Sequence, residues 1–303
     1  KFGIKMHDTM FLPAILHGCP TLILNKTTCK KFKSMQYNVA RAILQLRCRP
    51  AREALLGDLG FRPILDVIEK RQIDYFLYLK HSIKEGSVHK AIFNTMYNKY
   101  INGQEGKAFP YFANIQEILI KHGLDGILQR QDDNWYKTYI QISNDLSHVA
   151  FFSSIGEKSS LNLYKCLKSN LSKENYMNSD FDFYGQKLKF MARTGCFGLR
   201  SDLQRWGQGN GICLFCNLNV KDTIQHRLFV CPYFGSDRNV FFNNVVSNCN
   251  HQLSSDFLAG SVQLKTCWAL GDDTLILWGH DNYVKFDKYV KLFLKKIHVQ
   301  CTQ

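Results

Sequence analysis

Four residues in the C-terminal third of the chain have the types and spacing of metal ligands. Cys213 and Cys216 are separated by two residues, and His226 and Cys231 follow, with four residues between them. Two cysteines at this spacing reach one ion from a tight turn, and a His–Cys pair five positions apart closes a tetrahedron. Thiolate and imidazole ligands without a carboxylate select zinc over magnesium or calcium. Because four protein ligands leave no open coordination position, the pattern predicts a structural Zn²⁺ site; the alternative is a chance cluster in a chain with eleven cysteines.

A second pattern is a run of positive charge between residues 26 and 52, which contains no Asp or Glu. Its apolar residues recur at helical spacing, so many of its cations fall on the opposite face of the expected helix. Such a face can lie along a phosphate backbone, whereas solvated helix faces, the alternative, usually mix charges of both signs. The candidate phosphate contacts in this run are Lys26, Lys30, Lys31, Lys33, Arg41, Arg47, Arg49 and Arg52. Further candidates lie inside the metal motif (Lys221, Arg227) or flank it (Arg200, Arg205, Arg238).

A third pattern is the pair Asp272-Asp273, which imitates the paired aspartates of a template-dependent polymerase. Two-metal chemistry needs a further carboxylate close to both ions. No palm-sized sheet is expected before this pair, so we expect an acidic turn between strands, with an enzyme using both aspartates as the alternative. Asp132-Asp133 is expected at a helix N-terminus. The sequence has no glycine-rich phosphate loop and no recognisable context for a Ser–His–Asp or Cys–His nucleophile, so no catalytic residue is predicted.

The segments that must position these residues read mainly as helices. Apolar residues at three- and four-residue spacing predict a helix from Thr28, as N-cap, to about Leu46, and a long one from Pro63 to about Glu85. Further helices are expected over 51–56, 88–101, 114–122, 133–151, 161–167, 181–193 and 284–299. The Ser- and Asn-rich residues 153–180 predict a linker. Apolar pieces at 239–246 and 274–278 follow the metal ligands, where short strands are expected.

Composition limits the partners and the compartment. The 303 residues include 39 Lys and Arg against 25 Asp and Glu, a net charge of +14. This excess favours binding to polyanions, with nucleic acid before an anionic membrane surface; the alternative is that the charge serves solubility alone. No apolar run approaches the roughly 20 residues that span a bilayer. An odd number of scattered cysteines and no signal peptide favour a reducing, intracellular compartment. The first residue, Lys1, is not Met, so a fragment of a longer protein is expected.

Several short segments, in their order along the chain, resemble the reverse transcriptase of LINE-type (non-LTR) retrotransposons. Residues 12–19 resemble the segment just past the palm of that family, although His17 stands where Tyr is usual and Pro20 where an acidic residue is usual. The thumb of the family is matched by Gln36, Arg41, Ile43-Leu44, 50–56, Leu59-Gly60 and Pro63-Ile64. Ala192-Arg193-Thr194-Gly195 and Leu199 resemble its segment before the zinc ligands, and 226–232 and Arg238 its continuation.

The resemblance covers about 1–85 and 185–240, and it implies a function for the chain. It implies a mainly α fold with a basic, thumb-like helical region (1–85), a helical connector and linker (86–180), and a zinc-containing C-terminal domain with short strands (181–303). It also implies contacts to a template–primer duplex, template RNA or target DNA, with Arg193 among them, in nuclear and cytoplasmic ribonucleoprotein. The palm would precede Lys1, so the chain would bind, beside the upstream polymerase domains, and not catalyse. The alternative is a zinc-stabilised protein-interaction domain derived from such an element.

Overall fold

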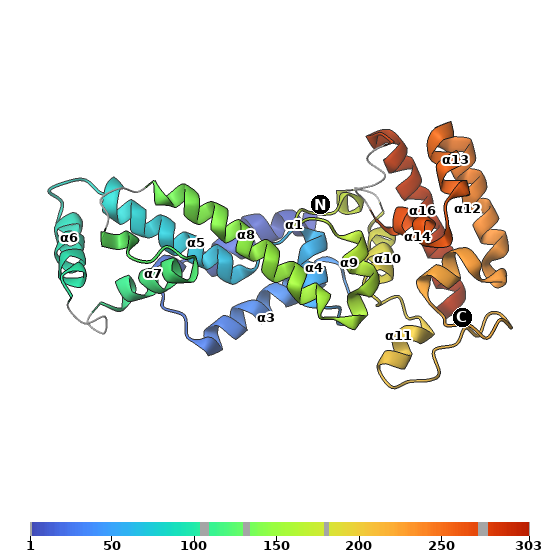
Figure 1. Cartoon of the computed structure of the whole chain (residues 1–303), viewed down its shortest axis with the longest axis horizontal. Helices are drawn as coiled ribbons and strands as arrows, with labels where there is room; N and C mark the ends of the chain where they lie inside the picture. The colour runs from blue at the N-terminus through green and yellow to red at the C-terminus, as the bar shows by residue number, and fades with distance from the viewer. Residues whose placement is uncertain (1, 104–108, 130–133, 179–181, 272–277, 303) are drawn as a thin grey trace. The chain divides into compact units, whose positions relative to one another are not determined.

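The computed structural model describes residues 2–103, 109–129, 134–178, 182–271 and 278–302, and these residues are mainly helical (Figure 1). The mainly α prediction is confirmed. Within the described ranges the only β pairing is an isolated antiparallel bridge between Ile212 and Lys221, so the expected short strands are not found there. Residues 239–246 lie instead in helix α12 (Gly235–Asn248). Both aspartate pairs, Asp132-Asp133 and Asp272-Asp273, lie outside the described residues.

The chain divides into two compact units, which differ from the three consecutive regions expected. One, here the N-terminal unit, comprises Phe2–Val39 and Arg62–Phe151. The other, here the C-terminal unit, comprises Ala40–Phe61 and Phe152–Gln303. The boundaries fall within helix α3 (Lys26–Ile43) and helix α8 (Trp135–Gly156). The expected thumb-like region (1–85) and the expected connector and linker region (86–180) are therefore each divided between the two units.

The N-terminal unit is held together by aromatic and aliphatic side chains from four helices. Phe76 packs near Phe93 and Tyr97, with ring centroids 6.1 and 5.8 Å away, and Phe112 and Tyr139 belong to the same buried cluster. Its elements, besides the first part of α3 and most of α8, are α1 (Phe2–Met6), η1 (His7–Phe11), α2 (Leu12–Leu16), η2 (Cys19–Thr21), α5 (Ile64–Leu77), η3 (Tyr78–Ser82), α6 (Val88–Ile101), α7 (Pro110–Lys121) and η5 (Ile127–Gln129).

Two polar side chains fix how α3 begins and where it lies against α5. The carboxamide oxygen of Asn25 accepts a hydrogen bond from the backbone N–H of Thr28 at 2.8 Å, so Asn25, and not Thr28, supplies the cap. The buried side chain of Gln36 donates to the carbonyl of Arg62 at 2.7 Å and accepts from the backbone N–H of Ile64 at 3.0 Å. Because both groups of Gln36 are satisfied, α3 is held at the start of α5.

The C-terminal unit is built around α16 (His280–Thr302), whose buried positions recur at helical spacing. Phe286, Val290, Phe293 and Ile297 form its apolar stripe, and Phe293 stacks on Phe241 of α12 with centroids 5.1 Å apart. The stripe was predicted from the same residues. The other elements of the unit are α4 (Arg52–Leu59), η6 (Ser159–Leu161), α9 (Asn162–Leu167), η7 (Asn175–Asn178), α10 (Phe183–Arg193), α11 (Arg200–Arg205), η8 (His226–Val230), η9 (Pro232–Phe234), α13 (His251–Ala259) and α14 (Val262–Leu270).

The Ser- and Asn-rich stretch 153–180 is packed and is not a linker over its described part. Tyr164 and Tyr176 are fully buried, and their hydroxyls donate to the two carboxylate oxygens of Asp58, at 2.9 and 2.5 Å. Arg193 forms ion pairs with Asp58, at 3.1 Å, and with Glu174, at 2.9 Å. Removing one partner of a buried ion pair costs about 3–5 kcal/mol, so this network ties α4, α10 and the stretch 162–176 together.

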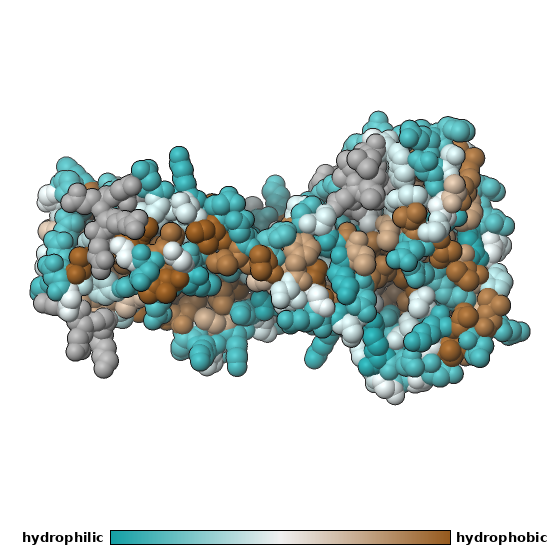
Figure 2. Space-filling view, in the orientation of Figure 1, coloured by the Kyte–Doolittle hydropathy of each residue, from teal (hydrophilic) through white to brown (hydrophobic). Residues whose placement is uncertain are grey.

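Polar residues dominate the visible surface of both units, with apolar residues scattered in small patches (Figure 2). Among the described residues, no helix combines the length and the apolar character needed to cross a membrane. All ten described cysteines are free.

Candidate metal centre and cation surface

The four predicted metal ligands converge in the C-terminal unit. One donor atom from each of Cys213, Cys216, His226 and Cys231 lies within 4.8 Å of all the others. The Sγ atoms of Cys213 and Cys231 are 4.0 Å apart, and the Sγ of Cys216 is 3.4 Å from Nε2 of His226. The arrangement could hold a metal ion. Three of the four side chains are buried, and Cys216 is half-buried.

A hairpin-like loop presents the first two ligands. The N–H of Cys213 donates to the carbonyl of Val220 at 3.0 Å, and the N–H of Asp222 donates to the carbonyl of Gly211 at 2.9 Å, on either side of the Ile212–Lys221 bridge. Asn219 turns the chain with a φ of 52°, a conformation that Asn tolerates better than most residues. The bridge therefore brings the ends of the loop that carries Cys213 and Cys216 together.

A single turn of π-helix presents the other two ligands. Residues His226–Val230 form η8, and the N–H of Cys231 donates to the carbonyl of His226 at 2.7 Å. Because a π-helical bond joins residues five apart, His226 and Cys231 stand at the two ends of one turn. The spacing of the second ligand pair thus follows from the local backbone.

Burial shifts the protonation of the ligand side chains. It raises the pKa of the Cys213 thiol and raises the pKa of Cys231 to about 12, because a thiolate is poorly solvated there. It lowers the pKa of His226, which favours the neutral imidazole that binds metals. A metal cation bound among these thiols would favour their ionised form.

Two of the cations predicted to contact phosphates surround this centre instead. Arg227 is buried, and its Nε and Nη2 donate to the two carboxylate oxygens of Asp222 at 2.6 and 2.5 Å. The half-buried Arg238 donates from Nη2 to the carbonyl of Cys231 at 2.5 Å. Both positive charges lie beside ligands that become negative when they hold a metal. For Arg227 the expectation of a nucleic-acid contact is corrected, because its guanidinium is enclosed.

Arg193 is likewise not a surface cation. Its side chain is 0% exposed, it is paired with Asp58 and Glu174, and its Nη1 donates to the carbonyl of Leu270 at 2.6 Å. The expected phosphate contact of Arg193 is therefore wrong in this structure, because reaching solvent would break a buried ion-pair network. Its role is to hold α10 to the elements around it.

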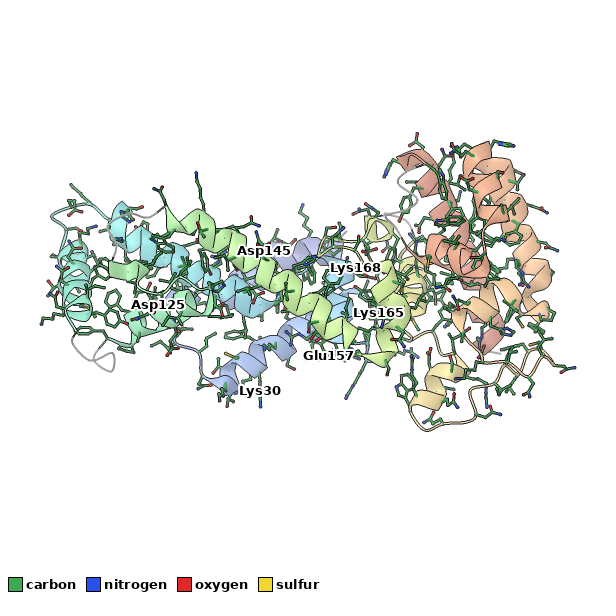
Figure 3. All side chains as sticks on the ribbon, in the orientation of Figure 1. Lys30, Asp125, Asp145, Glu157, Lys165 and Lys168 are labelled. Carbon is green, nitrogen blue, oxygen red and sulfur yellow. The ribbon has the colours of Figure 1, made fainter. Side chains whose placement is uncertain are left out.

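Within the basic run, the lysines of α3 are accessible to solvent, whereas Arg41 has a structural role. Lys26, Lys30 and Lys31 of α3 are exposed, Lys33 is half-buried, and none of them is ion-paired within the described residues; Lys30 projects from α3 in Figure 3. Arg41 instead donates to the carbonyls of Leu46, Arg47 and Cys48, at 3.3, 3.5 and 3.2 Å, where α3 ends. These bonds satisfy carbonyls beyond the helix terminus.

The remaining predicted cations are at least partly accessible. Arg47, Arg49, Arg205 and Lys221 are exposed, and Arg52 and Arg200 are half-buried. Arg205 also pairs with Asp202 at 2.5 Å. The lysines of α3 lie in the N-terminal unit, and all the other candidates lie in the C-terminal unit.

Two buried carboxylates of the C-terminal unit, Asp222 and Asp202, were not among the predicted site residues. Asp222 is fully buried and accepts hydrogen bonds from Arg227 and from the backbone N–H of Arg200, the latter at 2.8 Å. Asp202 of α11 is also buried. The only sequence signal for Asp222 is its position between the candidate ligands Cys216 and His226. A single Asp forms no sequence motif by itself.

Comparison of the chain with protein-family models, with curated proteins and with solved structures finds no match.

Proposed function

We propose that the chain is the nucleic-acid-binding C-terminal part of a LINE-type RNA-directed DNA polymerase, and that it grips RNA or DNA through exposed cations and a structural zinc module. The observation that carries the binding proposal is the lysine face of α3. Three of its lysines are exposed, and the sequence from residue 26 to residue 52 contains no Asp or Glu. Solvated helices usually intersperse charges of both signs, whereas a phosphate backbone favours one sign.

The ligand geometry supports zinc as the metal. In a tetrahedral site with Zn–S bonds near 2.3 Å and Zn–N bonds near 2.0 Å, neighbouring donor atoms lie about 3.5–3.8 Å apart. The Sγ–Sγ distance of 4.0 Å and the Sγ–Nε2 distance of 3.4 Å lie close to these values. Four protein ligands leave no position for substrate, so the zinc would stabilise the fold and supply no chemistry. Binding of this kind contributes about 10–16 kcal/mol at neutral pH.

The resemblance to the retrotransposon family supports the proposal through the order of the matching segments along the chain. The segment that resembles the Arg-Thr-Gly stretch of the family contains Arg193, Thr194 and Gly195, and it precedes the candidate metal ligands in the chain. Under the proposal this segment organises the module by its buried ion pairs. The surface cations then contact the phosphates.

A salt series with charge-reversed lysines tests this function. Replacing Lys26, Lys30 and Lys31 by Glu should weaken binding to an RNA or an RNA–DNA duplex at least ten-fold near 0.1 M salt. It should also reduce the magnitude of the slope of log K against log salt by roughly 2–3. Each phosphate contact that is lost reduces the number of counterions released on binding by about one. The helix should persist, because Glu in its first turns interacts favourably with the helix dipole.

A matched control keeps the same change in net charge. Lys285, Lys288 and Lys296 are three exposed lysines of α16, and their reversal to Glu should change affinity far less. Wild-type protein that binds no nucleic acid at low salt, or binds equally well at every salt concentration, contradicts the proposal. Equal losses of affinity in both triple variants would show that the effect comes from the net charge and not from the position of the α3 lysines.

A second candidate function is a zinc-stabilised protein-interaction domain. It is favoured by the exposed apolar side chains of the metal-binding loop, Leu214 and Leu218, which are 70% and 51% exposed. Under this alternative, reversing the α3 lysines leaves partner binding intact, and replacing Leu214 by Asp abolishes it. Nucleic-acid binding that survives Leu214→Asp but not the lysine reversal favours the first function.

A further inference from the structure

A groove of about 620 Å³ opens in the C-terminal unit beside the metal-binding loop. Leu163, Ala192, Leu199 and Ile224 supply apolar surface, and amides and hydroxyls such as Gln204, Gln225 and Ser201 supply polar groups. Apolar walls with a few convergent polar groups, at a volume between about 300 and 1,000 Å³, are typical of small-ligand sites. The groove is distinct from the metal ligands and from the lysine face of α3.

One polar atom in the lining of this groove has no partner. The side chain of Asp202 is 4% exposed; its Oδ1 accepts from Nη2 of Arg205 at 2.5 Å, and its Oδ2 has no hydrogen-bond partner among the described residues. A buried acceptor without a donor destabilises the fold, and more so when it is charged. Oδ2 of Asp202 is therefore able to accept a hydrogen bond from a donor on a ligand bound in the groove.

Two cations lie in the lining of the same groove. Arg205 is held against the backbone of Gly195: its Nη2 donates to the Gly195 carbonyl at 3.2 Å, and a Cβ at this position would lie 2.5 Å from that nitrogen. The φ of Gly195 is +66°, which other residues rarely adopt. Lys221 is exposed and has no ion-pair partner within the described ranges. The absence of a side chain at Gly195 thus leaves space for the guanidinium of Arg205, which lines the groove.

We propose that this groove binds one unstacked nucleotide of a single strand, its phosphate against Arg205 and Lys221 and a donor of its base or ribose against Oδ2 of Asp202. The inference rests on the proposed nucleic-acid function and names where a single nucleotide is held. Single-stranded nucleic acids are recognised through splayed bases that offer a flat face and hydrogen-bonding edges. A nucleotide combines the anion, the N–H or O–H donor and the apolar face that the groove complements.

Titration of the 303-residue chain, loaded with metal, with the four ribonucleoside 5′-monophosphates tests this site. Binding measured by calorimetry and by amide chemical shifts should map to residues around 192–205 and 221–225. Asp202→Asn and Lys221→Ala should each raise the Kd about ten-fold, because a hydrogen bond to a charged group or a charge contact is lost. Lys285→Ala, an exposed lysine on α16, is the matched control and should leave the Kd unchanged.

Each outcome has a separate meaning. No nucleotide binding, shifts outside the groove, or equal binding of inorganic phosphate alone overturns the groove inference. If RNA still binds in a salt-dependent manner that requires the α3 lysines, the proposed function stands while the groove inference fails. If RNA does not bind but nucleotides do, the function fails and the groove remains a nucleotide site. Should Asp202→Asn unfold, the exposed Lys221→Ala variant decides.

Discussion

Asp202 and Asp222 are buried in the same unit, and they differ in how their charge is compensated. Both oxygens of Asp222 are bonded to Arg227, with a further bond from the backbone of Arg200. Oδ1 of Asp202 accepts a hydrogen bond from Arg205, whereas Oδ2 has no hydrogen-bond partner among the described residues. At the scale of single residues, the first is a structural ion pair and the second is an acceptor that lacks a donor.

This difference predicts a pH-dependent contribution to stability. Burial raises the pKa of Asp202 to about 6, with Arg205 acting in the opposite direction, whereas the unfolded value is about 4. The folded state therefore binds the proton more tightly, and acidification from pH 6 towards pH 4 stabilises it. We expect Asp202→Asn to remove this gain, so that the difference in unfolding free energy between variant and wild type changes by about 1 kcal/mol between pH 7 and pH 5. Urea unfolding at both pH values, with saturating metal, measures it; a constant difference contradicts the prediction.

At the scale of elements, the π-turn η8 determines whether the ligands meet. His226 and Cys231 lie at its ends because one i to i+5 bond spans them. The hairpin-like loop that carries Cys213 and Cys216 is closed separately, by the bridge between Ile212 and Lys221. Each short element therefore contributes one pair of candidate ligands, and a metal ion bound there would join the two elements.

Changing the length of this turn should abolish metal binding. Elemental analysis should find close to one zinc per wild-type chain, as four ligands predict. One Ala inserted after Phe229 rotates Cys231 by roughly 100° about the helix axis, so zinc affinity should fall at least ten-fold. The matched control is one Ala inserted after Gln208, an exposed position outside the ligand span, and it should keep its zinc. Full zinc occupancy after the first insertion would contradict the assignment.

At the scale of the whole molecule, the two units have separate cores and different sources of stability. The N-terminal unit is closed by aromatic packing around Phe76 and Phe112. The C-terminal unit contains the α16 stripe, the buried network around Arg193 and the metal centre. Because the ligands belong to one unit only, loss of the metal should loosen one unit and spare the other.

Chelation followed by hydrogen–deuterium exchange checks this expectation on the full chain. A zinc chelator should raise exchange in peptides covering 211–231 by at least ten-fold, since metal binding in such sites is folding free energy. Peptides from 64–77 and 110–121 should exchange as before. Cys249→Ser, which removes a cysteine outside the cluster, should behave as wild type. Equal changes in both units, or none in 211–231, would refute a structural metal confined to the C-terminal unit.

Short-range spacing predicts the candidate metal ligands and a part of the helices. Apolar periodicity placed α6 and α16 closely but missed α12, where residues 239–246 were expected as a strand. The Cys and His intervals match a tight loop and a single π-turn. Which charges reach solvent depends on tertiary packing. Arg193, Arg227 and Lys30 are all cations in basic surroundings, yet two are enclosed with carboxylates and one is exposed. Their partners Asp58, Glu174 and Asp222 come largely from distant positions, and burial is set by packing over the whole unit, which no local pattern encodes.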